Sequence, residues 1–236
     1  GSGTASPTLP WVRPGVLPGE PAPRSDRYAP GAALADANLV GENLRNTNLG
    51  GADLERARLA SADMTDANLT NALLRGADLQ KAILTRAQLT AANLEGADLR
   101  GAYLKGTDLK GCDLSRVNGA AAYFRDAVLT QADMSLANLK GADLSEAKLL
   151  EANLRGADLG RANLKGADLW GAKLEDADLR SAKLDRANLR SAHLEGADLD
   201  GASLGNARLT GARYDSSTRW PAGFNPRGRG AVATGG

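Results

Sequence analysis

The sequence is poor in the residues that form most reactive sites. Among its 236 residues there is one cysteine, Cys112, and one histidine, His193. These counts exclude a disulfide framework and a Cys/His zinc site. Only 4% of the residues are aromatic, although 42% are hydrophobic. The core must therefore consist mainly of small and aliphatic side chains.

Long hydrophobic runs are absent as well. No stretch of about 18 apolar residues occurs, so we expect no transmembrane helix. Nothing resembles a secretory signal peptide, and we expect a cytoplasmic location. The 29 Lys and Arg residues balance 28 Asp and Glu residues, so the net charge neither requires nor excludes a nucleic-acid or membrane partner. Without a nucleophile elbow, a phosphate-binding loop or a dinucleotide fingerprint, we expect no enzyme and no cofactor.

A five-residue repeat dominates what is present. Every fifth residue from Leu34 to Tyr214 forms a series of 37 centres, of which 32 are Leu. The residue two positions before the centre is Ala in 32 repeats, and the residue between them is Asp or Asn in 22. Gly follows two positions after the centre in 14 repeats. Ala52-Asp53-Leu54 shows the pattern.

The five-residue period excludes an ordinary helix and a straight strand. On an α-helix a step of five residues turns about 500°, so the Leu side chains would form no apolar face. On a straight strand an odd step places successive Leu side chains on opposite faces. Ala and Leu two residues apart point the same way on a short extended segment, and a turn can bring the next pair inward again. The chain must therefore coil around a narrow axis, with one pentapeptide on each side.

The unbroken tandem of Ala-[Asp/Asn]-Leu-x-x over residues 32–214 resembles the pentapeptide repeat family. The resemblance implies an all-β fold, a right-handed quadrilateral β-helix (a pentapeptide-repeat solenoid) with four pentapeptides per coil. It also implies that Leu and Ala fill the interior. The 37 repeats would then form about nine coils, roughly 43 Å in length at the usual strand spacing. Because each coil packs only on its neighbours, both ends need caps.

The segments on either side of the repeats differ from them in composition. Residues 1–31 open with Gly1-Ser2-Gly3, which resembles a remnant of cloning, and continue as a Pro-rich arm that can form neither a helix nor a central strand. This arm is either a disordered linker or folds Trp11 or Leu17 back onto the first coil. Residues 215–236 resemble the tail that closes many members of the family. There Trp220 and Phe224 would cover the last apolar ring, and the Gly-rich segment from residue 227 onward is expected to be flexible.

Two departures from the motif fall at inward positions. Glu42 replaces an Ala, and because an unpaired buried carboxylate is costly, we expect a loose or wet first coil or a partner such as Arg24 or Arg27. Gly119 replaces a central Leu, and an unfilled cavity there would cost about 2–5 kcal/mol. We expect a local bend or bulge, or inward packing of Phe124. A tolerated structural defect explains Gly119 more simply than a functional break does.

With four repeats per coil, the outward positions of every fourth repeat would stack in one column. The first column is rich in acids and amides: Asp78, Asp98, Asn118, Asn138, Asp158, Asp178 and Asp198. It either reflects the preference of the motif for Asp and Asn or imitates the phosphates of DNA. The resemblance implies the second option for some members of the family, which bind type II topoisomerases such as gyrase and so protect from or modulate topoisomerase poisons. Against this, the repeats carry 25 acidic and 23 basic residues, and five bases share the face: Lys81, Arg100, Lys140, Arg161 and Arg180.

Two other columns carry large apolar residues. Ile83, Tyr103 and Tyr123 replace Asp or Asn in three consecutive coils, with Lys105 and Arg125 beside the tyrosines. Leu150 beneath Trp170 forms a smaller, secondary patch. Tyr and Arg are typical of protein-contact surfaces, but scattered apolar surface residues are also normal. Both interpretations stay open.

The sequence therefore predicts a non-enzymatic, rod-shaped scaffold that mediates protein–protein interaction. Its protein partner is unidentified, a topoisomerase-binding DNA mimic is the alternative, and a homodimer through a rod end is left open. We expect no direct nucleic-acid contact and no membrane segment in the chain. The stacked Thr70 and Thr90 are followed by Lys110, which argues against ice binding. One carboxylate per coil makes a poor metal site, and His193 has neither a Cys nor a second His, so we expect no metal.

Overall fold

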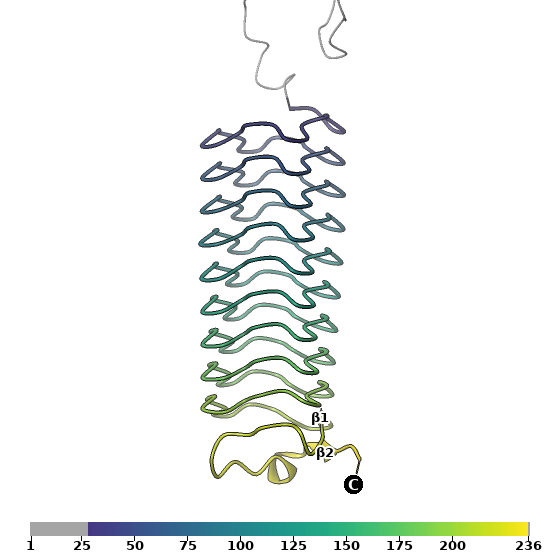
Figure 1. Ribbon diagram of the computed structural model, residues 1–236, viewed down its shortest axis with the longest axis vertical. Helices are drawn as coiled ribbons and strands as arrows, with labels where there is room; N and C mark the ends of the chain where they lie inside the picture. Colours follow the sequence, from purple (N-terminus) through teal and green to yellow (C-terminus); the bar gives the residue numbers. More distant parts are fainter. Residues whose placement is uncertain (1–27, 236) are drawn as a thin grey trace, which may run out of the picture.

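The structure, a computed structural model, describes residues 28–235 and is a rod made almost entirely of short parallel β-bridges (Figure 1). Its longer elements lie at the C-terminal end: strand β1 (Arg213–Tyr214), the 3-10 helix η1 (Arg227–Arg229) and strand β2 (Val232–Ala233). The described residues contain no α-helix, so the fold is all-β. Between residues 28 and 235 no helix has the length and apolar character needed to cross a membrane.

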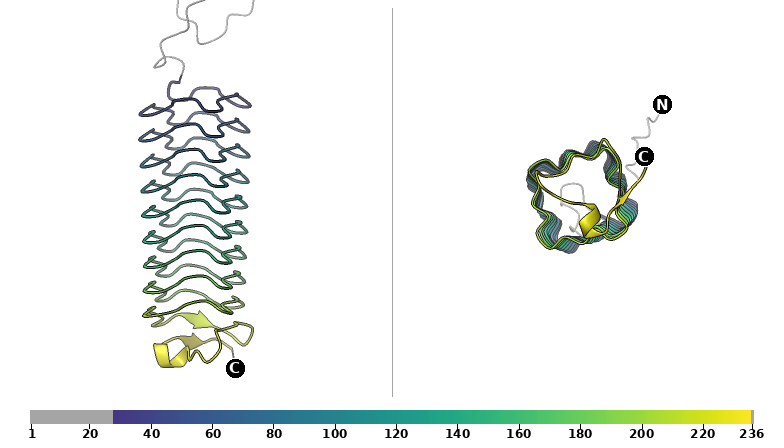
Figure 2. Two further views of the ribbon diagram at one scale, coloured as in Figure 1. Left: turned by 90° about the vertical axis from the view of Figure 1, so that its left-hand side faces the viewer. Right: turned by 90° about the horizontal axis from the view of Figure 1, so that it is seen from below.

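Each bridge residue pairs in parallel with the equivalent residue four repeats later along the chain. Asp53 pairs with Leu73, for example, and Leu73 pairs with Asn93. Backbone hydrogen bonds accompany each bridge: Leu54 N–H donates to Leu73 O at 2.7 Å, and Leu73 N–H donates to Ala52 O at 2.9 Å. A coil therefore consists of four pentapeptides, which we call the four-repeat register. A view along the axis shows the coils lying one above another (Figure 2).

A tight turn closes each pentapeptide. Ala57 N–H donates to the carbonyl oxygen of Leu54 at 3.0 Å, and the second corner residue, Arg56, has a φ of +53°. A positive φ at this position alone is typical of a type II β-turn. All 36 second-corner positions between Asp36 and Gly211 have positive φ, and 22 of them are not glycine. The repeat thus imposes a left-handed conformation on ordinary residues, at about 1 kcal/mol each.

The inward Ala and Leu side chains form one continuous hydrophobic core. Every centre from Leu39 to Leu209 is buried, including Met64 and Met134. The first coil is looser, because Leu34 is only partly buried and Glu42 is half-exposed. The suggested partners of Glu42, Arg24 and Arg27, lie outside the described residues, as do Trp11 and Leu17.

Tyr28 covers part of the N-terminal end of the core. Its side chain is 3% exposed and belongs to the hydrophobic cluster. The sequence analysis did not single it out, because a lone Tyr between charged residues and a Pro shows no periodicity.

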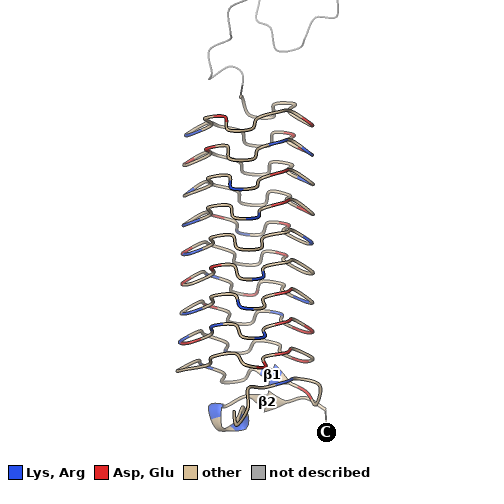
Figure 3. Ribbon diagram, turned by 60° about the vertical axis from the view of Figure 1, so that its left-hand side comes forward, with Lys and Arg blue, Asp and Glu red and all other residues tan. Residues whose placement is uncertain are grey.

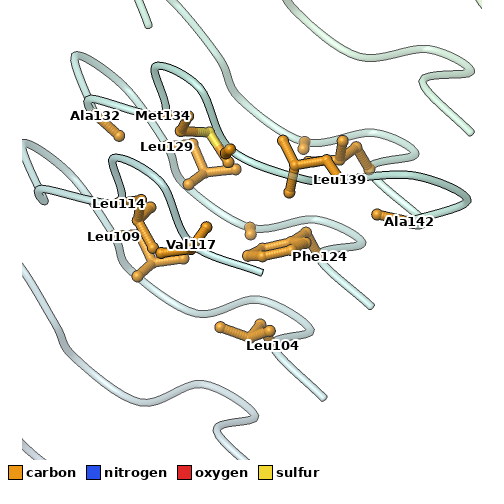
Figure 4. Packing of buried hydrophobic residues seen from close by; sticks show 14 of the residues in the cluster. Leu104, Leu109, Leu114, Val117, Phe124, Leu129, Ala132, Met134, Leu139 and Ala142 are labelled. Carbon is orange, nitrogen blue, oxygen red and sulfur yellow. The ribbon is translucent and has the colours of Figure 1, made fainter. Parts of the chain in front are cut away.

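The backbone ladder continues without a bulge at Gly119. Gly119 N–H donates to Asn138 O at 2.7 Å, as at the neighbouring centres. A Cβ atom at Gly119 would lie 3.0 Å from Leu139 Cδ2 and 3.6 Å from Phe124 Cε2. Phe124 is fully buried and points into the rod (Figure 4). A larger side chain at the next centre thus occupies the space that the missing Leu would fill.

Two polar inward residues donate to the backbone of the preceding coil. Thr107 Oγ1 donates to Leu84 O at 2.7 Å, and Cys112 Sγ donates to Leu89 O at 2.8 Å. Burial raises the pKa of the Cys112 thiol to about 12. Because the thiolate is the reactive form, burial and the raised pKa both disfavour reaction of Cys112 at neutral pH.

The four-repeat register ends at Asp198, which pairs with Arg219, one residue beyond the position that the register would give. The carboxylate of Asp215 holds the longer loop together. Asp215 Oδ1 accepts hydrogen bonds from Ser217 Oγ at 2.7 Å, from Thr218 N–H at 3.0 Å and from Gly196 N–H at 3.1 Å. The hydrogen bonds from Ser217 and Gly196 lower the pKa of Asp215 to about 2.

Aromatic side chains cover the C-terminal end of the core. Trp220 and Phe224 pack against the hydrophobic cluster. Their ring centroids lie 5.2 Å apart, and Trp220 meets Tyr214 edge-on at 5.6 Å. The last apolar ring is therefore shielded by three rings contributed by the chain itself.

The Gly-rich segment differs from the flexible tail that the sequence predicted. It forms η1, and β2 then pairs in parallel with β1. Val232 N–H donates to Ala212 O at 2.7 Å, and Thr234 N–H donates to Tyr214 O at 2.7 Å. The prediction overlooked the backbone carbonyl oxygens of the last coil, which would have no hydrogen-bond donor from a further coil. The segment after the repeats supplies these donors and extends the ladder of backbone hydrogen bonds.

Ala91 and Ala92 are neighbours with opposite conformational demands. Ala91 is a corner residue with a φ of +57°, whereas Ala92 points inward and is 1% exposed. We expect Ala91→Gly to raise the free energy of unfolding by about 0.5–1 kcal/mol, because Gly adopts positive φ without strain. Ala92→Gly should lower it by about 1 kcal/mol, through a lost buried methyl group and a more flexible unfolded chain. Urea unfolding followed by circular dichroism measures both, and equal destabilisation would contradict corner strain.

Gly119 and Phe124 should be energetically coupled. Gly119→Leu adds a side chain to a filled space and should destabilise the rod by about 1–3 kcal/mol. Phe124→Leu alone removes buried volume and should also destabilise it. The double variant restores the motif at both centres. Its loss of unfolding free energy should therefore be smaller than the sum of the losses of the two single variants, by about 1 kcal/mol or more. Additive losses in the same unfolding assay would show that the two sites are independent.

Asp215→Asn should lower the melting temperature at neutral pH by weakening the C-terminal loop. Because the pKa of Asp215 in the folded protein is depressed to about 2, its contribution is present above the ordinary carboxyl pKa and is lost as the pH falls through the folded value. The difference in melting temperature between parent and variant should therefore shrink between about pH 4 and pH 2. Ser216→Ala, at an exposed neighbour, serves as the control and should change little. A difference that does not depend on pH would contradict this role for the carboxylate.

Candidate functional site

The Asp and Asn residues of the motif serve the backbone of the turn that follows them. Within the repeats no backbone carbonyl accepts a hydrogen bond from the first corner residue. In 20 of the 22 repeats with Asp or Asn, the side-chain oxygen of that residue accepts this N–H, as Asp53 does from Glu55 at 3.1 Å. Such local bonds are the usual role of Asx side chains at turns. The motif acids therefore have a structural purpose whatever else they do.

The acidic column is largely compensated by arginines. Arg100 pairs with Asp98 at 2.6 Å, Arg219 pairs with Asp198 at 2.9 Å, and Arg180 pairs with Asp178. The hydrogen bond from Arg180 also holds the pKa of Asp178 below its usual range. Asp78 and Asp158 accept backbone N–H groups of Gln80 and Gly160. Acidic and basic residues are interspersed along the ribbon of the rod (Figure 3), and three of the five acids of this column are paired with arginines.

The structure brings Ile83, Tyr103 and Tyr123 into one column. Ile83 pairs with Tyr103, and Tyr103 pairs with Tyr123, on successive coils. The two phenol rings are parallel within 5°, with centroids 5.0 Å apart, and each tyrosine is 46% exposed. Ile83 is half-buried beside them. The ring edges and hydroxyl groups therefore face solvent, while the stacked ring faces support each other.

Exposed cations border this column. Lys105 and Arg125 follow the tyrosines by two residues and are exposed. Arg125 Nε lies 3.7 Å from Asp126 Oδ2, and both of these side chains are about half exposed. We call Ile83, Tyr103, Tyr123, Lys105 and Arg125 the tyrosine patch. Tyr and Ile side chains cannot provide the turn acceptor that Asp or Asn gives, so these repeats lack a stabilising bond that the motif normally supplies.

The secondary patch of Leu150 and Trp170 is smaller. Trp170 is 42% exposed, and Leu150 is half-buried in the preceding coil. Exposed apolar residues that the sequence analysis missed are Val40, Leu73, Leu136 and Val232, of which Leu136 is the most exposed, at 57%. Leu136 occupies a corner position, two residues after the centre Met134, with a φ of +58°. Corner residues point outward, so its position in the repeat could have predicted its exposure.

A cluster of Glu175, His193 and Glu195 was also missed. One potential ligand atom from each of the three lies within 4.8 Å of the others. His193 Nδ1 lies 3.5 Å from Glu175 Oε1. Glu195 follows Glu175 by one full coil, and His193 precedes Glu195 by two positions. The recurrence of Glu at the same corner of two successive coils, two residues from the single histidine, was the available signal. Because His193 and Glu175 occupy different positions of the motif, the period alone does not place them together.

Arginines hold one oxygen of each glutamate in this cluster. Arg155 donates to Glu175 Oε1 at 2.7 Å, and Arg213 Nε lies 3.0 Å from Glu195 Oε1. Partial burial is the largest single influence on the pKa of Glu175 and by itself would raise it. The hydrogen bond from Arg155, the backbone N–H of Glu175 and the charges of Arg155 and His193 together outweigh burial and leave the pKa below its usual value. Glu175 is therefore ionised at neutral pH.

Comparisons with known proteins agree with the repeat. The model of the family of pentapeptide repeats matches in 8 copies, at residues 31–66, 52–86, 82–118, 122–161, 157–196 and 177–213. Among solved structures, the chain is 33% identical to HetL, a protein involved in heterocyst differentiation regulation from the cyanobacterium Nostoc sp. strain PCC 7120. That match covers 78% of this chain and 87% of HetL, with a TM-score of 0.43.

Two other pentapeptide repeat structures illustrate the range of similarity. Rfr23 from the cyanobacterium Cyanothece 51142 is 32% identical over 54% of this chain and 90% of its own, with a TM-score of 0.40. QnrB1, a plasmid-mediated fluoroquinolone resistance protein, is 18% identical in its trypsin-treated form over 77% of this chain and 86% of its own, with a TM-score of 0.43. No curated protein matches the chain. On the repeats matched by the family model, which cover most of its length, this chain belongs to the pentapeptide repeat family.

Proposed function

We propose that this protein is a non-enzymatic scaffold that binds a protein partner through the tyrosine patch. The observation that carries the proposal is the exposed, parallel pair of Tyr103 and Tyr123 on adjacent coils. Tyrosine offers a large apolar surface and a hydroxyl group with little conformational entropy to lose on binding. The rod holds both rings in place before a partner arrives, so the ordering cost of binding is small.

The chemistry of the patch suggests an acidic partner segment with apolar residues. Lys105 and Arg125 are exposed on the same side as the rings, and they could meet carboxylates of the partner. The corner residues next to the tyrosines, Gly101 and Ala121, are small and leave the ring edges accessible. The secondary patch, Leu150 and Trp170, lies in another column and would extend or replace this contact for a larger partner.

A DNA mimic that binds a type II topoisomerase is the second candidate. The column of Asp78, Asp98, Asp158, Asp178 and Asp198 favours it, because successive coils repeat a negative group on either side of the neutral Asn118 and Asn138. The ion pairs of Asp98, Asp178 and Asp198 with arginines argue against it. An assay of gyrase supercoiling with and without the protein separates the candidates, since the scaffold proposal expects no inhibition.

We further propose that residues 32–214 form the right-handed quadrilateral β-helix of about nine coils, in the cytoplasm, with Trp220 and Phe224 as its C-terminal cap. The four-repeat register and the turn at every fifth residue support the shape and the number of coils. The three rings over the last coil support a rod that does not dimerise through that end. Analytical ultracentrifugation of the full chain should give a monomer.

Replacing both tyrosines by Asp should abolish partner binding without unfolding the rod. Asp restores the motif, and its carboxylate can accept the free turn N–H of Lys105 and Arg125, so the melting temperature should not fall. The full chain is used as bait in extracts of the native cell, and captured proteins are quantified by mass spectrometry. We expect the amount of the specific partner captured by Tyr103→Asp/Tyr123→Asp to be at least about 10-fold lower than that captured by the parent, as for the loss of a central contact cluster.

A matched control uses the same position of the motif on another side of the rod. Lys173→Asp also introduces the motif residue at an outward bridge position, in a column two sides of the rod away from that of the tyrosines, and should leave capture unchanged. If the double tyrosine variant retains every partner that the parent captures, the patch is not the binding surface.

A further inference from the structure

We propose that Glu175, His193 and Glu195 form a binding site for one divalent transition-metal ion of the Zn²⁺ type. Their potential ligand atoms lie within 4.8 Å of one another, so small side-chain movements bring all three to one ion. Carboxylate oxygen and imidazole nitrogen together form a ligand set that Zn²⁺ accepts. The site lies apart from the tyrosine patch and does not depend on the proposed scaffold function.

Two carboxylate oxygen atoms of this cluster lack a hydrogen-bond donor. Glu175 Oε2 and Glu195 Oε2 are shielded from solvent and have no hydrogen-bond partner. Their side chains are only 15% and 19% exposed. A buried ionised oxygen without a donor is costly. A cation bound by the two glutamates would add positive charge beside these carboxylates and so lower this cost.

The neighbouring arginines bind only one oxygen of each glutamate. Arg155 and Arg213 each bind the other oxygen, Oε1, of their glutamate. The two guanidinium side chains are 60% and 50% exposed, so solvent screens their charges from an approaching cation. Hydrogen bonds to a ligating carboxylate orient it and are a usual feature of metal sites. Thr234 Oγ1, 3.5 Å from Glu195 Oε1, adds a weak contact of the same kind.

The register explains why the site occurs at this place in the rod. Glu175 and Glu195 occupy equivalent first-corner positions of successive coils, and His193 occupies the bridge position just before Glu195. The sequence contains no other histidine, and the thiol of Cys112 is buried in the core. His193 is 33% exposed, so water can complete the coordination of a three-residue site.

A metal ion here would join the last regular coils to the C-terminal closure. Arg213 belongs to β1, and Thr234 follows β2. Both contact Glu195. Binding of the ion should therefore stabilise the C-terminal end of the rod, in addition to linking two coils.

Isothermal titration of the full chain with ZnCl₂ tests the site. The protein carries no oligohistidine tag and is treated with a chelator and dialysed beforehand. We expect one Zn²⁺ per chain, and a higher melting temperature in its presence because the ion binds the folded state. His193→Asn and Glu195→Gln should each weaken binding by about 10-fold or more, and Zn²⁺ should shift the single histidine ring signals in the NMR spectrum of the parent.

Glu95→Gln is the matched control. Glu95 occupies the same column as Glu175 and has an arginine partner, Arg75, at 3.3 Å, but no histidine nearby in the register. It should bind Zn²⁺ like the parent, and MgCl₂ should produce no comparable shift in melting temperature. The melting temperatures of the metal-free variants show that each is folded. Absence of binding, or equal affinity in parent and His193→Asn, would overturn the proposal.

Discussion

A hydrogen bond from an inward Ala N–H to the carbonyl oxygen of the preceding central Leu closes a turn at every fifth residue, and the remaining structure depends on this bond. It limits each side of the coil to two inward side chains and one outward side chain between them. It also holds the second corner residue at positive φ, glycine or not. Four such turns return the chain to its starting side, where the backbone pairs with the coil below.

The fixed interior leaves variation to the outward positions, but not all of that variation carries functional information. Most Asp and Asn residues accept the N–H of the following corner, as Asp53 does, and their abundance follows from the needs of the backbone. Residues that lack this acceptor are more informative. Tyr103, Tyr123 and His193 each occupy such a position, and each has neighbours on an adjacent coil with which it forms a local cluster.

The sequence predicted the inward and outward assignment of side chains because the period is unbroken and each side chain has one direction. It predicted the stack of Tyr103 on Tyr123 for the same reason, since equal positions recur after every four repeats. It did not predict the pairing of β2 with β1, or the contact of Arg213 with Glu195. These involve the segment after the repeats, where no period specifies the direction of the chain. For Gly119 the sequence left two outcomes open, because choosing between a bend and a repacked Phe124 requires the positions of side chains in three coils.

The contact of His193 with Glu175 illustrates a general limit of predicting neighbours from the sequence period. A prediction from the period finds only neighbours that occupy the same position of the motif in successive coils. His193 and Glu175 occupy different positions of the motif. Charged side chains are long enough to cross from one column to the next, so ion pairs such as Arg45 with Asp63 join a corner position to a bridge position. Contacts of this kind require the geometry of the coil as well as its period.

The four-repeat register also restricts how such a protein can change in length during evolution. A duplication or deletion of four whole repeats adds or removes one coil and leaves every outward residue in its column. A change of a single repeat preserves the core, because the centres remain in phase, but it moves all later residues by one side of the rod. A change by any fraction of a repeat disrupts the interior. Insertion or deletion of one whole repeat can therefore shift part of the surface by a quarter turn without changing the packing of the core. New combinations of outward residues on neighbouring coils arise in this way within the same fold.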